Sequence, residues 1–462
     1  MSIVFSHIDF FVARSIIFVE DIMFKGEQKM FGNLSTSNCA CGKEHIFTSK
    51  VIAESGAINR LPEILDEISA KRVFLIADKN TYAAAGEKVC EILDKHGTRV
   101  KKYVFNKDEL EPDEANVGLA VMNFDNGCDA VISVGSGVIN DIGKIVANIS
   151  SKKYIIVGTA PSMDGYASAT SSMTVDGLKS SVNSKCADYI VGDIDILAKA
   201  PVKMMVSGLG DMLAKYVSIC EWRISALING EYYCEEIAKL VRSSLNKCVS
   251  NADGLLSGDK EAVKAVFEGL VVCGAAMNFA GVSRPASGVE HYLSHIWDMR
   301  GVEFGLPVEF HGIQCALGTL ISVGVYEKIK KLTPDFDKGV AYAQSFDVNE
   351  WNEELRAFLG RGAESMIELE NKEHKYDVDA HKIRLRKIID SWDEIMKIVS
   401  EELPEYDALL SLCEKLGLPT KLSDIGVDEK ILPMTFKASK DIRDKYVLPR
   451  LCFDLGIIDE II

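Results

Sequence analysis

The stretch VISVGSGVINDIGK, residues 131–144, joins a short apolar run to a helical pattern through Gly135 and Gly137. Glycines in such a turn let backbone N–H groups approach a pyrophosphate, and the N-terminus of the following helix adds partial positive charge. We therefore expect a dinucleotide site here. The stretch departs from the full G-x-G-x-x-G pattern, so a turn that uses glycine only for its geometry is the competing interpretation.

The segments around this stretch repeat the same alternation of strand and helix. A helix is expected over residues 81–97 and another from about Asn140, and four apolar runs indicate strands: KRVFLIAD (71–78), RVKKYVF (99–105), DAVISVG (129–135) and KKYIIVGTAP (152–161). Strands that alternate with helices predict a parallel sheet built from βαβ units. We expect an α/β, Rossmann-like nucleotide-binding domain over residues 30–200.

Beyond residue 200 the pattern changes to long amphipathic helices without a convincing strand between them. Examples are DMLAKYVSICEWRISAL, which we expect to begin at Asp211, and KEAVKAVFEGLVVCGAAMNFA (260–280). The charged tail from Glu350 indicates solvated helices on the outside. We expect an all-α domain over residues 201–462 that binds metal and substrate. Two domains suit this length, because single hydrophobic cores stop growing near about 250–300 residues.

The composition excludes several classes of partner. The formal net charge of -16 opposes non-specific binding to nucleic acid or to an anionic membrane, so small molecules are the expected partners. The 12 cysteines form no disulfide framework, which indicates reduced thiols and the cytoplasm. Cys39 and Cys41, with His45 nearby, resemble a zinc site. However, their spacing is unusual and a second ligand pair is missing, so we interpret them as structural.

The first residues are apolar, but they include charges at intervals too short for a membrane span of about 20 apolar residues. They also lack the features of a signal peptide. Residues 25–27, Lys-Gly-Glu, are encodable by a bacterial ribosome-binding sequence just upstream of Met30. We therefore expect Met30 to be the native start and residues 1–29 to be a leader or extension.

Two further stretches carry polar groups at the ends of expected strands. Asp78 ends the first strand, where its carboxylate suits an adenosine ribose, although it also suits a helix N-cap. GTAPSMDGYASATSSM (158–173) is a long run of small and hydroxylic residues after another strand, which includes Ser168. Ligands bind at this edge of parallel sheets, and Asp164 there offers a carboxylate to a substrate hydroxyl. An ordinary turn with Asp164 as a cap is the alternative.

Three of the eight histidines lie close together, at His291, His295 and His311. His291 and His295 are four residues apart, so they share one face of a helix. Asp211 offers a third ligand beside two of these histidines. Because one aspartate and two histidines leave a coordination position open, this set suits a catalytic metal, with zinc, nickel and ferrous iron as the alternatives.

At this point five separated motifs carry a family resemblance. GSGVINDIGK, TAPSMDGYAS, VSGLGDMLAKYVSICEW, SRPASGVEHYLSHIWDM and EFHGIQCALG together resemble the bacterial sn-glycerol-1-phosphate dehydrogenases, over about residues 36–456. That family lies within the metal-dependent polyol dehydrogenases and the dehydroquinate synthase-like proteins. The wider group usually shows GGGS in the phosphate turn, whereas this chain has GSGV, as the glycerol-phosphate branch does.

The resemblance implies a dehydroquinate synthase-like fold, a divalent metal and a nicotinamide cofactor. Asp211, His291 and His311 are the implied metal ligands, and Asp211 also borders the substrate. Asp164 and His295 are the implied catalytic residues beside the substrate. The expected cofactor contacts are Asp78, Gly135, Ser136, Gly137, Asp141, Lys144, Thr159, Ser162 and Ser168, although Lys144 also suits a solvated helix face.

The implied reaction is NAD(P)H-dependent interconversion of dihydroxyacetone phosphate and sn-glycerol-1-phosphate, by hydride transfer at C2. A phosphate needs a cation, and Arg284 precedes the metal-binding helix, although a surface arginine is the commoner outcome. Asp78 favours NADH because its charge repels a 2′-phosphate. Three other functions stay open: a dehydrogenase of unphosphorylated polyols, a dehydroquinate synthase-like lyase and a non-catalytic relative. The chain could also form a homo-oligomer.

Overall fold

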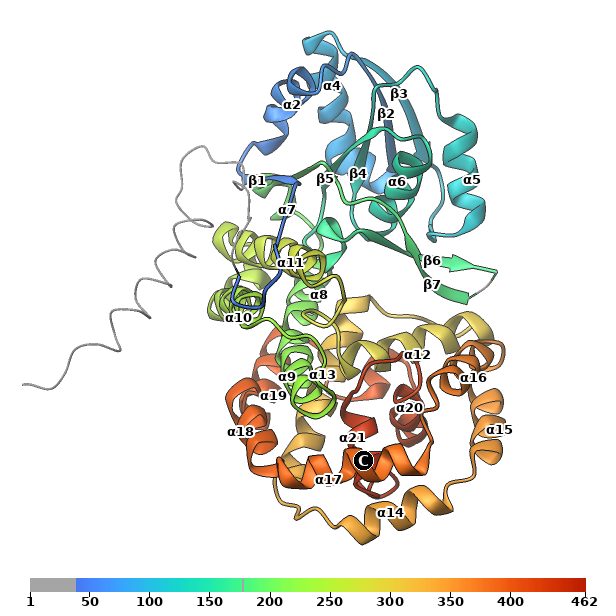
Figure 1. Cartoon of the computed structure of the whole chain (residues 1–462). Coiled ribbons are helices and arrows are strands. Elements are labelled where there is room, and N and C mark those ends of the chain that lie inside the picture. Colours follow the sequence, from blue (N-terminus) through green and yellow to red (C-terminus); the bar gives the residue numbers. More distant parts are fainter. Residues whose placement is uncertain (1–38, 177) are drawn as a thin grey trace, which may run out of the picture.

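A six-stranded parallel sheet, in the order β1-β8-β5-β4-β2-β3, forms the first half of the chain (Figure 1). The computed structural model describes residues 39–176 and 178–462, so the expected leader and start at Met30 lie outside the described residues. The six strands are β1 Lys50–Glu54, β2 Arg72–Asp78, β3 Arg99–Phe105, β4 Ala130–Gly135, β5 Lys153–Gly158 and β8 Tyr189–Asp193. Four of them match the predicted strands, whereas β1 and β8 were not predicted.

Alternate residues of the central strands feed two separate cores, as the two-residue period of a strand requires. Val73 and Leu75 of β2 join a core with α2 (Leu61–Glu67) and α4 (Glu87–His96). Phe74 and Ile76 join the other core, which includes α6 (Gly137–Ile149) and continues into the helical half. The second face of the sheet therefore shares its core with the rest of the molecule.

The strand order reverses between β2 and β4. The chain runs from β2 outward to β3, and then returns to the other side of β2 as β4. In open parallel sheets, ligands bind in the crevice at the carboxyl ends of the strands where this reversal occurs. Asp78 ends β2 and Gly135 ends β4, so both predicted nucleotide residues lie at that point.

The helices of the first half are short and lie between the strands. The expected helix 81–97 is α3 Lys79–Thr81, a π-helical turn Tyr82–Gly86 and α4 in succession. Helix α5 spans Glu114–Asn123 and α7 spans Ile194–Leu197. Helix α6 begins at Gly137, earlier than the predicted start near Asn140, because Ser136 caps it by accepting a hydrogen bond from the Gly137 N–H.

Part of the hydroxylic stretch 158–173 is ordered as secondary structure and is not a simple loop. A 3-10 turn covers Asp164–Ala167, and β6 (Thr170–Val175) pairs antiparallel with β7 (Leu178–Asn183). This hairpin projects from the sheet toward α12 and α16 of the helical half (Figure 1). The hairpin was not predicted.

The second half is entirely helical in the described residues. Its helices are α8 Val202–Leu213, α9 Lys215–Asn229, α10 Glu235–Ser250, α11 Lys260–Ala280, α12 Val289–Phe304, α13 His311–Ile329, α14 Phe336–Ser345, α15 Val348–Leu359, α16 Gly362–Glu373, α17 Val378–Asp390, α18 Trp392–Glu402, α19 Tyr406–Leu416, α20 Leu432–Ser439 and α21 Leu448–Asp454. The predicted α/β half followed by a helical half is confirmed. Asp211 lies in the last turn of α8, so the expectation that a helix begins there is wrong.

Helix α11 belongs to the second half and packs against the sheet of the first half. Its Phe267 packs where Gly158 of β5 and Gly192 of β8 lie side by side, because a Cβ on Gly192 would meet the Phe267 ring at 2.2 Å. Within the described residues, α11 is also the one helix long and apolar enough to cross a membrane, but 83% of its apolar window is buried inside the protein. It is therefore a core helix.

Candidate active site

Asp78 caps the helix that follows β2. Its Oδ1 accepts hydrogen bonds from the N–H groups of Asn80 (2.8 Å) and Thr81 (3.0 Å), and the Thr81 hydroxyl accepts one from the Asp78 N–H. The capping function weighed from the sequence is therefore present. Both bonds to the carboxylate use the same oxygen, which fixes its direction at the carboxyl edge of the sheet.

The glycine turn after β4 forms the N-terminus of α6. The Ser136 and Ser162 hydroxyls share a hydrogen bond of 2.9 Å, which joins this turn to the loop after β5. A Cβ on Gly135 would lie 2.5 Å from Ile139, whereas a Cβ on Gly137 would meet only Met163, at an ordinary 3.5 Å. Gly135 is thus required by packing, and Gly137 leaves its backbone open to a ligand.

Lys144 fastens the loop that follows β5 to α6. Its side chain is fully buried, and Nζ donates to the carbonyls of Gly165 (2.6 Å) and Thr170 (2.9 Å). It is therefore not the solvated lysine considered as an alternative. Asp141 Oδ1 lies 3.6 Å from Nζ, and burial raises the pKa of Asp141 to about 6 despite this lysine.

The hydroxyl groups of the loop are largely enclosed. Thr159 and Ser162 are buried, and the Thr159 N–H donates to the Gly135 carbonyl at 3.1 Å. The Ser168 hydroxyl accepts from the Thr170 N–H at 3.1 Å and also contacts the Thr170 hydroxyl. The predicted loop residues therefore lie on one folded segment beside the turn at residues 135–137.

The predicted metal ligands come from three helices. Asp211 lies in the last turn of α8, His291 lies in the first turn of α12, and His311 is the first residue of α13. His291 Nε2 lies 3.5 Å from Asp211 Oδ1, and the ring centroids of His291 and His311 are 5.0 Å apart. His295 stacks on His311 at 5.9 Å.

Ligand atoms gather here in two overlapping groups. Those of Asp164, Asp211 and His291 lie within 4.8 Å of one another, and so do those of His291, His311 and Cys315. His291 belongs to both groups and therefore links Asp211 with His311. In addition, the Asp164 N–H donates to Asp211 Oδ2 at 2.9 Å, so a hydrogen bond joins the loop after β5 directly to α8.

The histidines have fixed orientations. His291 Nδ1 lies 2.8 Å from Glu290 Oε1, which turns its Nε2 toward Asp211. His311 Nδ1 lies 3.1 Å from the Ser294 hydroxyl. Cys315, one helical turn after His311, was missed by the sequence analysis although the spacing in HGIQC places it on the same face.

Lys215 is a second residue that the sequence analysis missed. Its buried Nζ donates to Asp164 Oδ2 (2.9 Å), Asp211 Oδ1 (2.8 Å) and the Ala286 carbonyl (2.9 Å). Burial alone would raise the pKa of Asp211, but the charge of Lys215 and the contact with His291 outweigh it, so that pKa is lowered. The spacing of four residues between Asp211 and Lys215 was the available signal.

Arg284 is neither at the surface nor free for a substrate. Its guanidinium is buried and donates to Glu231 at 2.6 and 2.8 Å, to the Tyr446 carbonyl and to the Ser225 hydroxyl. Burial lowers the pKa of His295, as do the positive charges of His311 and His291 and, to a smaller extent, those of Arg443 and Lys445. Lys445 is anchored by the Ser283 hydroxyl and the Ser287 carbonyl.

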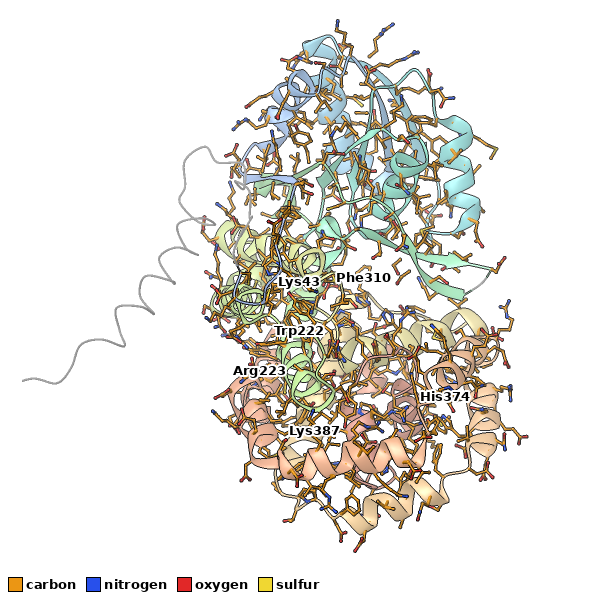
Figure 2. All side chains as sticks on the ribbon, viewed as in Figure 1. Lys43, Trp222, Arg223, Phe310, His374 and Lys387 are labelled. Carbon is orange, nitrogen blue, oxygen red and sulfur yellow. The ribbon has the colours of Figure 1, made fainter. Side chains whose placement is uncertain are left out.

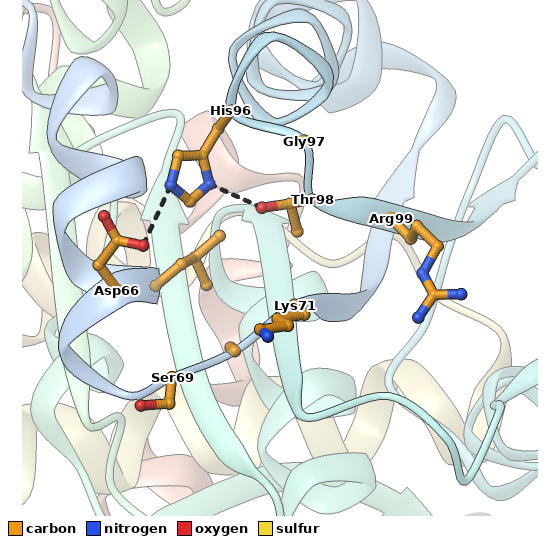
Figure 3. Close-up of a pocket in the computed structure, with 9 residues that line it drawn as sticks. Asp66, Ser69, Lys71, His96, Gly97, Thr98 and Arg99 are labelled. Carbon is orange, nitrogen blue, oxygen red and sulfur yellow. Dashed lines mark hydrogen bonds and ion pairs between the residues drawn. The ribbon is translucent and has the colours of Figure 1, made fainter.

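A surface hollow of about 470 Å³ lies far from these residues in the fold (Figure 3). It is lined by Lys71 and Arg99, which lie at the amino ends of β2 and β3, and by His96, which contacts Asp66 and Thr98. The hollow is therefore at the opposite edge of the sheet from Asp78 and Gly135. It contains none of the predicted site residues.

The chain is similar in sequence to known dehydrogenases. A family model described as iron-containing alcohol dehydrogenase matches residues 52–201. A glycerol-1-phosphate dehydrogenase (NAD(P)+) of Halalkalibacterium halodurans is 29% identical over 417 residues, which cover 89% of this chain and 94% of that protein. Its namesake from Hyperthermus butylicus is 34% identical over 278 residues, which cover 59% of this chain and 76% of that protein.

Solved structures share the fold at lower identity. Glycerol dehydrogenase from Schizosaccharomyces pombe is 18% identical with a TM-score of 0.57, and 88% of each chain is covered. Maleylacetate reductase from Rhizobium sp. strain MTP-10005 is 13% identical with a TM-score of 0.57, covering 93% of this chain and 97% of that one. These likenesses support the fold and not a particular substrate.

Proposed function

The chain belongs to the glycerol-1-phosphate dehydrogenases, within the iron-containing alcohol dehydrogenase family, and from this premise we propose how its residues divide the reaction. The enzyme is an NAD(P)-dependent oxidoreductase that interconverts dihydroxyacetone phosphate and sn-glycerol-1-phosphate, a reaction of lipid biosynthesis. The observation that carries the proposal is the hydrogen bond from the Asp164 N–H to Asp211. It brings the nucleotide edge of the sheet against the metal-binding helices.

The donor set of Asp211, His291 and His311 fits a divalent cation. Carboxylate and imidazole suit zinc, nickel and ferrous iron, and partners such as Glu290 and Ser294 orient metal-binding histidines. The ligand atoms of this set fall in two overlapping groups, each within 4.8 Å and both including His291, which is the spacing that side chains around one cation have. When bound, the cation polarises the substrate oxygen, and the nicotinamide exchanges hydride with C2.

We assign cofactor binding to the first half of the chain, up to about residue 200. The pyrophosphate binds at the turn of residues 135–137, where the N-terminus of α6 contributes partial positive charge. Asp78 accepts hydrogen bonds from the ribose through the oxygen that the cap does not use, which favours NADH over NADPH. Asp141 and Lys144, together with Thr159, Ser162 and Ser168, shape the loop that borders the nicotinamide.

We assign substrate binding to residues of both halves. Asp164 accepts from a substrate hydroxyl while Lys215 holds its carboxylate in place. His295 stacks on His311, and we assign it the proton relay: one ring nitrogen donates a proton to the oxygen at C2 while the other accepts one. We assign the substrate phosphate to Arg443 and Lys445 in place of Arg284, which is engaged by Glu231. Burial lowers the pKa of Lys445 to about 7, and a phosphate beside it favours its charged form.

The expected partners follow from this chemistry. A phosphorylated triose and a nicotinamide cofactor are cytoplasmic metabolites, and we propose the cytoplasm as the compartment. The net charge of -16 disfavours nucleic acid and anionic membranes as partners. The role of the second half as the metal- and substrate-binding domain rests on the three ligand helices α8, α12 and α13.

The test is NADH oxidation by the purified protein with dihydroxyacetone phosphate, after EDTA treatment and re-addition of zinc, nickel or iron in turn. We expect turnover to return with at least one ion and the product to be the sn-1 phosphate. Dihydroxyacetone and glycerol, which lack the phosphate, are the matched control substrates. Equal turnover on these controls would contradict the assignment of Arg443 and Lys445, and no turnover with any ion would contradict the proposed chemistry.

A further inference from the structure

A second group of metal-binding side chains lies outside the active site. Cys39, Cys41 and His45 precede the edge strand β1, and Cys234 is the residue just before α10. Cys39 Sγ lies 3.4 Å from Cys234 Sγ, and His45 Nε2 lies 3.3 Å from Cys41 Sγ and 3.5 Å from Cys234 Sγ. All four ligand atoms lie within 4.8 Å of one another.

These separations match a four-coordinate zinc site. Three sulfurs at about 2.3 Å and one nitrogen at about 2.0 Å from a tetrahedral ion are about 3.5–3.8 Å from each other. The observed separations of 3.3–3.5 Å are equal to or shorter than these values, by at most about 0.4 Å. Three thiols with one imidazole are also a usual donor set of structural zinc, and soft sulfur ligands favour zinc over magnesium or calcium.

The surroundings of the group are ordered in the way that a metal site needs. His45 is buried, and its Nδ1 lies 3.3 Å from the Phe279 carbonyl, which directs Nε2 toward the sulfurs. The Tyr232 hydroxyl donates to Cys41 Sγ at 3.3 Å. The Lys43 ammonium lies 3.5 Å from the centre of the Tyr232 ring and adds positive charge beside the thiols.

We propose that Cys39, Cys41, His45 and Cys234 bind a structural Zn²⁺ ion, separate from the catalytic cation. From the sequence, Cys39 and Cys41 are expected to be structural, because their spacing is unusual and a second ligand pair is missing. In the fold, His45 and Cys234 form that second pair, and Cys234 lies 195 residues from Cys39. The proposal is independent of the dehydrogenase reaction, since none of the four residues takes part in it.

The site joins the two halves of the molecule. The segment before β1 runs down along α10 and α11 (Figure 1), and Lys43 lies at the level where the sheet half meets the helical half (Figure 2). Cys234 belongs to the turn between α9 and α10, and Phe279 lies near the end of α11. A bound ion would therefore fix the start of the sheet to two helices of the other half.

The first measurement is the metal content of the full-length protein, purified without chelator after growth with added zinc. We expect one zinc per chain that resists EDTA and is released by an organomercurial that blocks thiols. His291→Ala, which removes a catalytic ligand, should leave this ion bound. Cys39→Ser and Cys234→Ser should lose it, whereas Cys90→Ser, a cysteine outside the group, should keep it.

Cobalt provides a spectroscopic signature for the same site. Protein produced with Co²⁺ should show sulfur-to-cobalt charge-transfer absorption that persists in His291→Ala and disappears in Cys39→Ser. If the serine variants fail to fold, mercurial release of zinc from the unchanged protein decides the matter. Absence of EDTA-resistant metal would overturn the proposal, as would a thiol titration of the unfolded protein two short of its 12 cysteines, which indicates a disulfide.

Discussion

At the scale of single residues, Lys215 is the centre of the charge arrangement in the active site. Its ammonium donates hydrogen bonds to the carboxylates of both Asp164 and Asp211. The backbone N–H of Asp164 also donates to Asp211, so two interactions join these residues. The charge of the buried ammonium helps to lower the pKa of Asp211, and metal binding requires its carboxylate form. It also fixes the direction of the Asp211 ligand atom that faces His291.

Lys215→Met removes the ammonium and keeps most of the side chain. We expect metal affinity to fall by about 10–100-fold, as is usual when a residue that orients a metal ligand is lost, and turnover to fall with it. The measurement is metal affinity by competition with a chelator, combined with steady-state kinetics. Lys203→Met, an exposed lysine of α8 paired with Glu309, is the control. Unchanged affinity and turnover would show that Lys215 is only structural.

Individual residues were predictable where a short spacing carried the signal. His291 and His295 lie on the same helix, as expected from the sequence. Arg284 shows the limit of this reasoning. Its partner Glu231 and the Tyr446 carbonyl are 53 and 162 positions away, so only the folded chain reveals that the guanidinium is engaged.

At the scale of elements, the turn between β4 and α6 separates packing from binding within three residues. Gly135 has no room for a side chain because of Ile139, whereas Gly137 has room but faces the expected pyrophosphate. Gly135 is thus needed for packing, whereas we expect Gly137 to be needed for binding. A single substitution at each position distinguishes them.

Gly137→Ala should fold normally and lose about 10-fold or more in NADH affinity, because its methyl group would occupy the space at the N-terminus of α6. Gly135→Ala should instead lower the free energy of unfolding by about 1–3 kcal/mol, the usual cost of overpacking. NADH fluorescence titration and thermal unfolding of both variants make the comparison. If Gly137→Ala binds NADH as the parent does, the pyrophosphate lies elsewhere.

The elements that the sequence predicted are those with a strong local pattern. Strand β3 and helix α11 match their expected ranges. Strand β1 was missed because only Val51 and Ile52 are buried, as suits an edge strand. The β6–β7 hairpin was missed because its serines and threonines resemble a loop and the hairpin depends on pairing between the two strands.

At the scale of the whole molecule, the proposed nucleotide and metal sites belong to different halves that share one core. The proposed cofactor residues lie on or next to β2, β4, β5 and α6, and the proposed metal ligands lie on α8, α12 and α13. The hydrophobic cluster on one face of the sheet is continuous with the helical half. Hydride transfer therefore depends on the relative position of two halves that each build their own site.

Removal of the catalytic metal with EDTA should abolish turnover and leave NADH affinity within about 2-fold of its original value. The reason is that the cofactor contacts do not include Asp211, His291 or His311. NADH fluorescence titration before and after chelation checks this, and re-addition of metal is the control for damage. Joint loss of nucleotide binding would indicate that the loop around Asp164 collapses without the cation.

The position of β1 has a consequence for how the chain is made. Lys50–Glu54 pairs with Tyr189–Asp193, so the first described strand finds its neighbour only after the rest of the sheet has been synthesised. Until β8 has left the ribosome, the segment that includes Cys39, Cys41 and His45 has no sheet to join. Closure of the sheet by its earliest strand is thus a late event of biosynthesis, and a nascent chain released before Asp193 would lack one edge of the sheet.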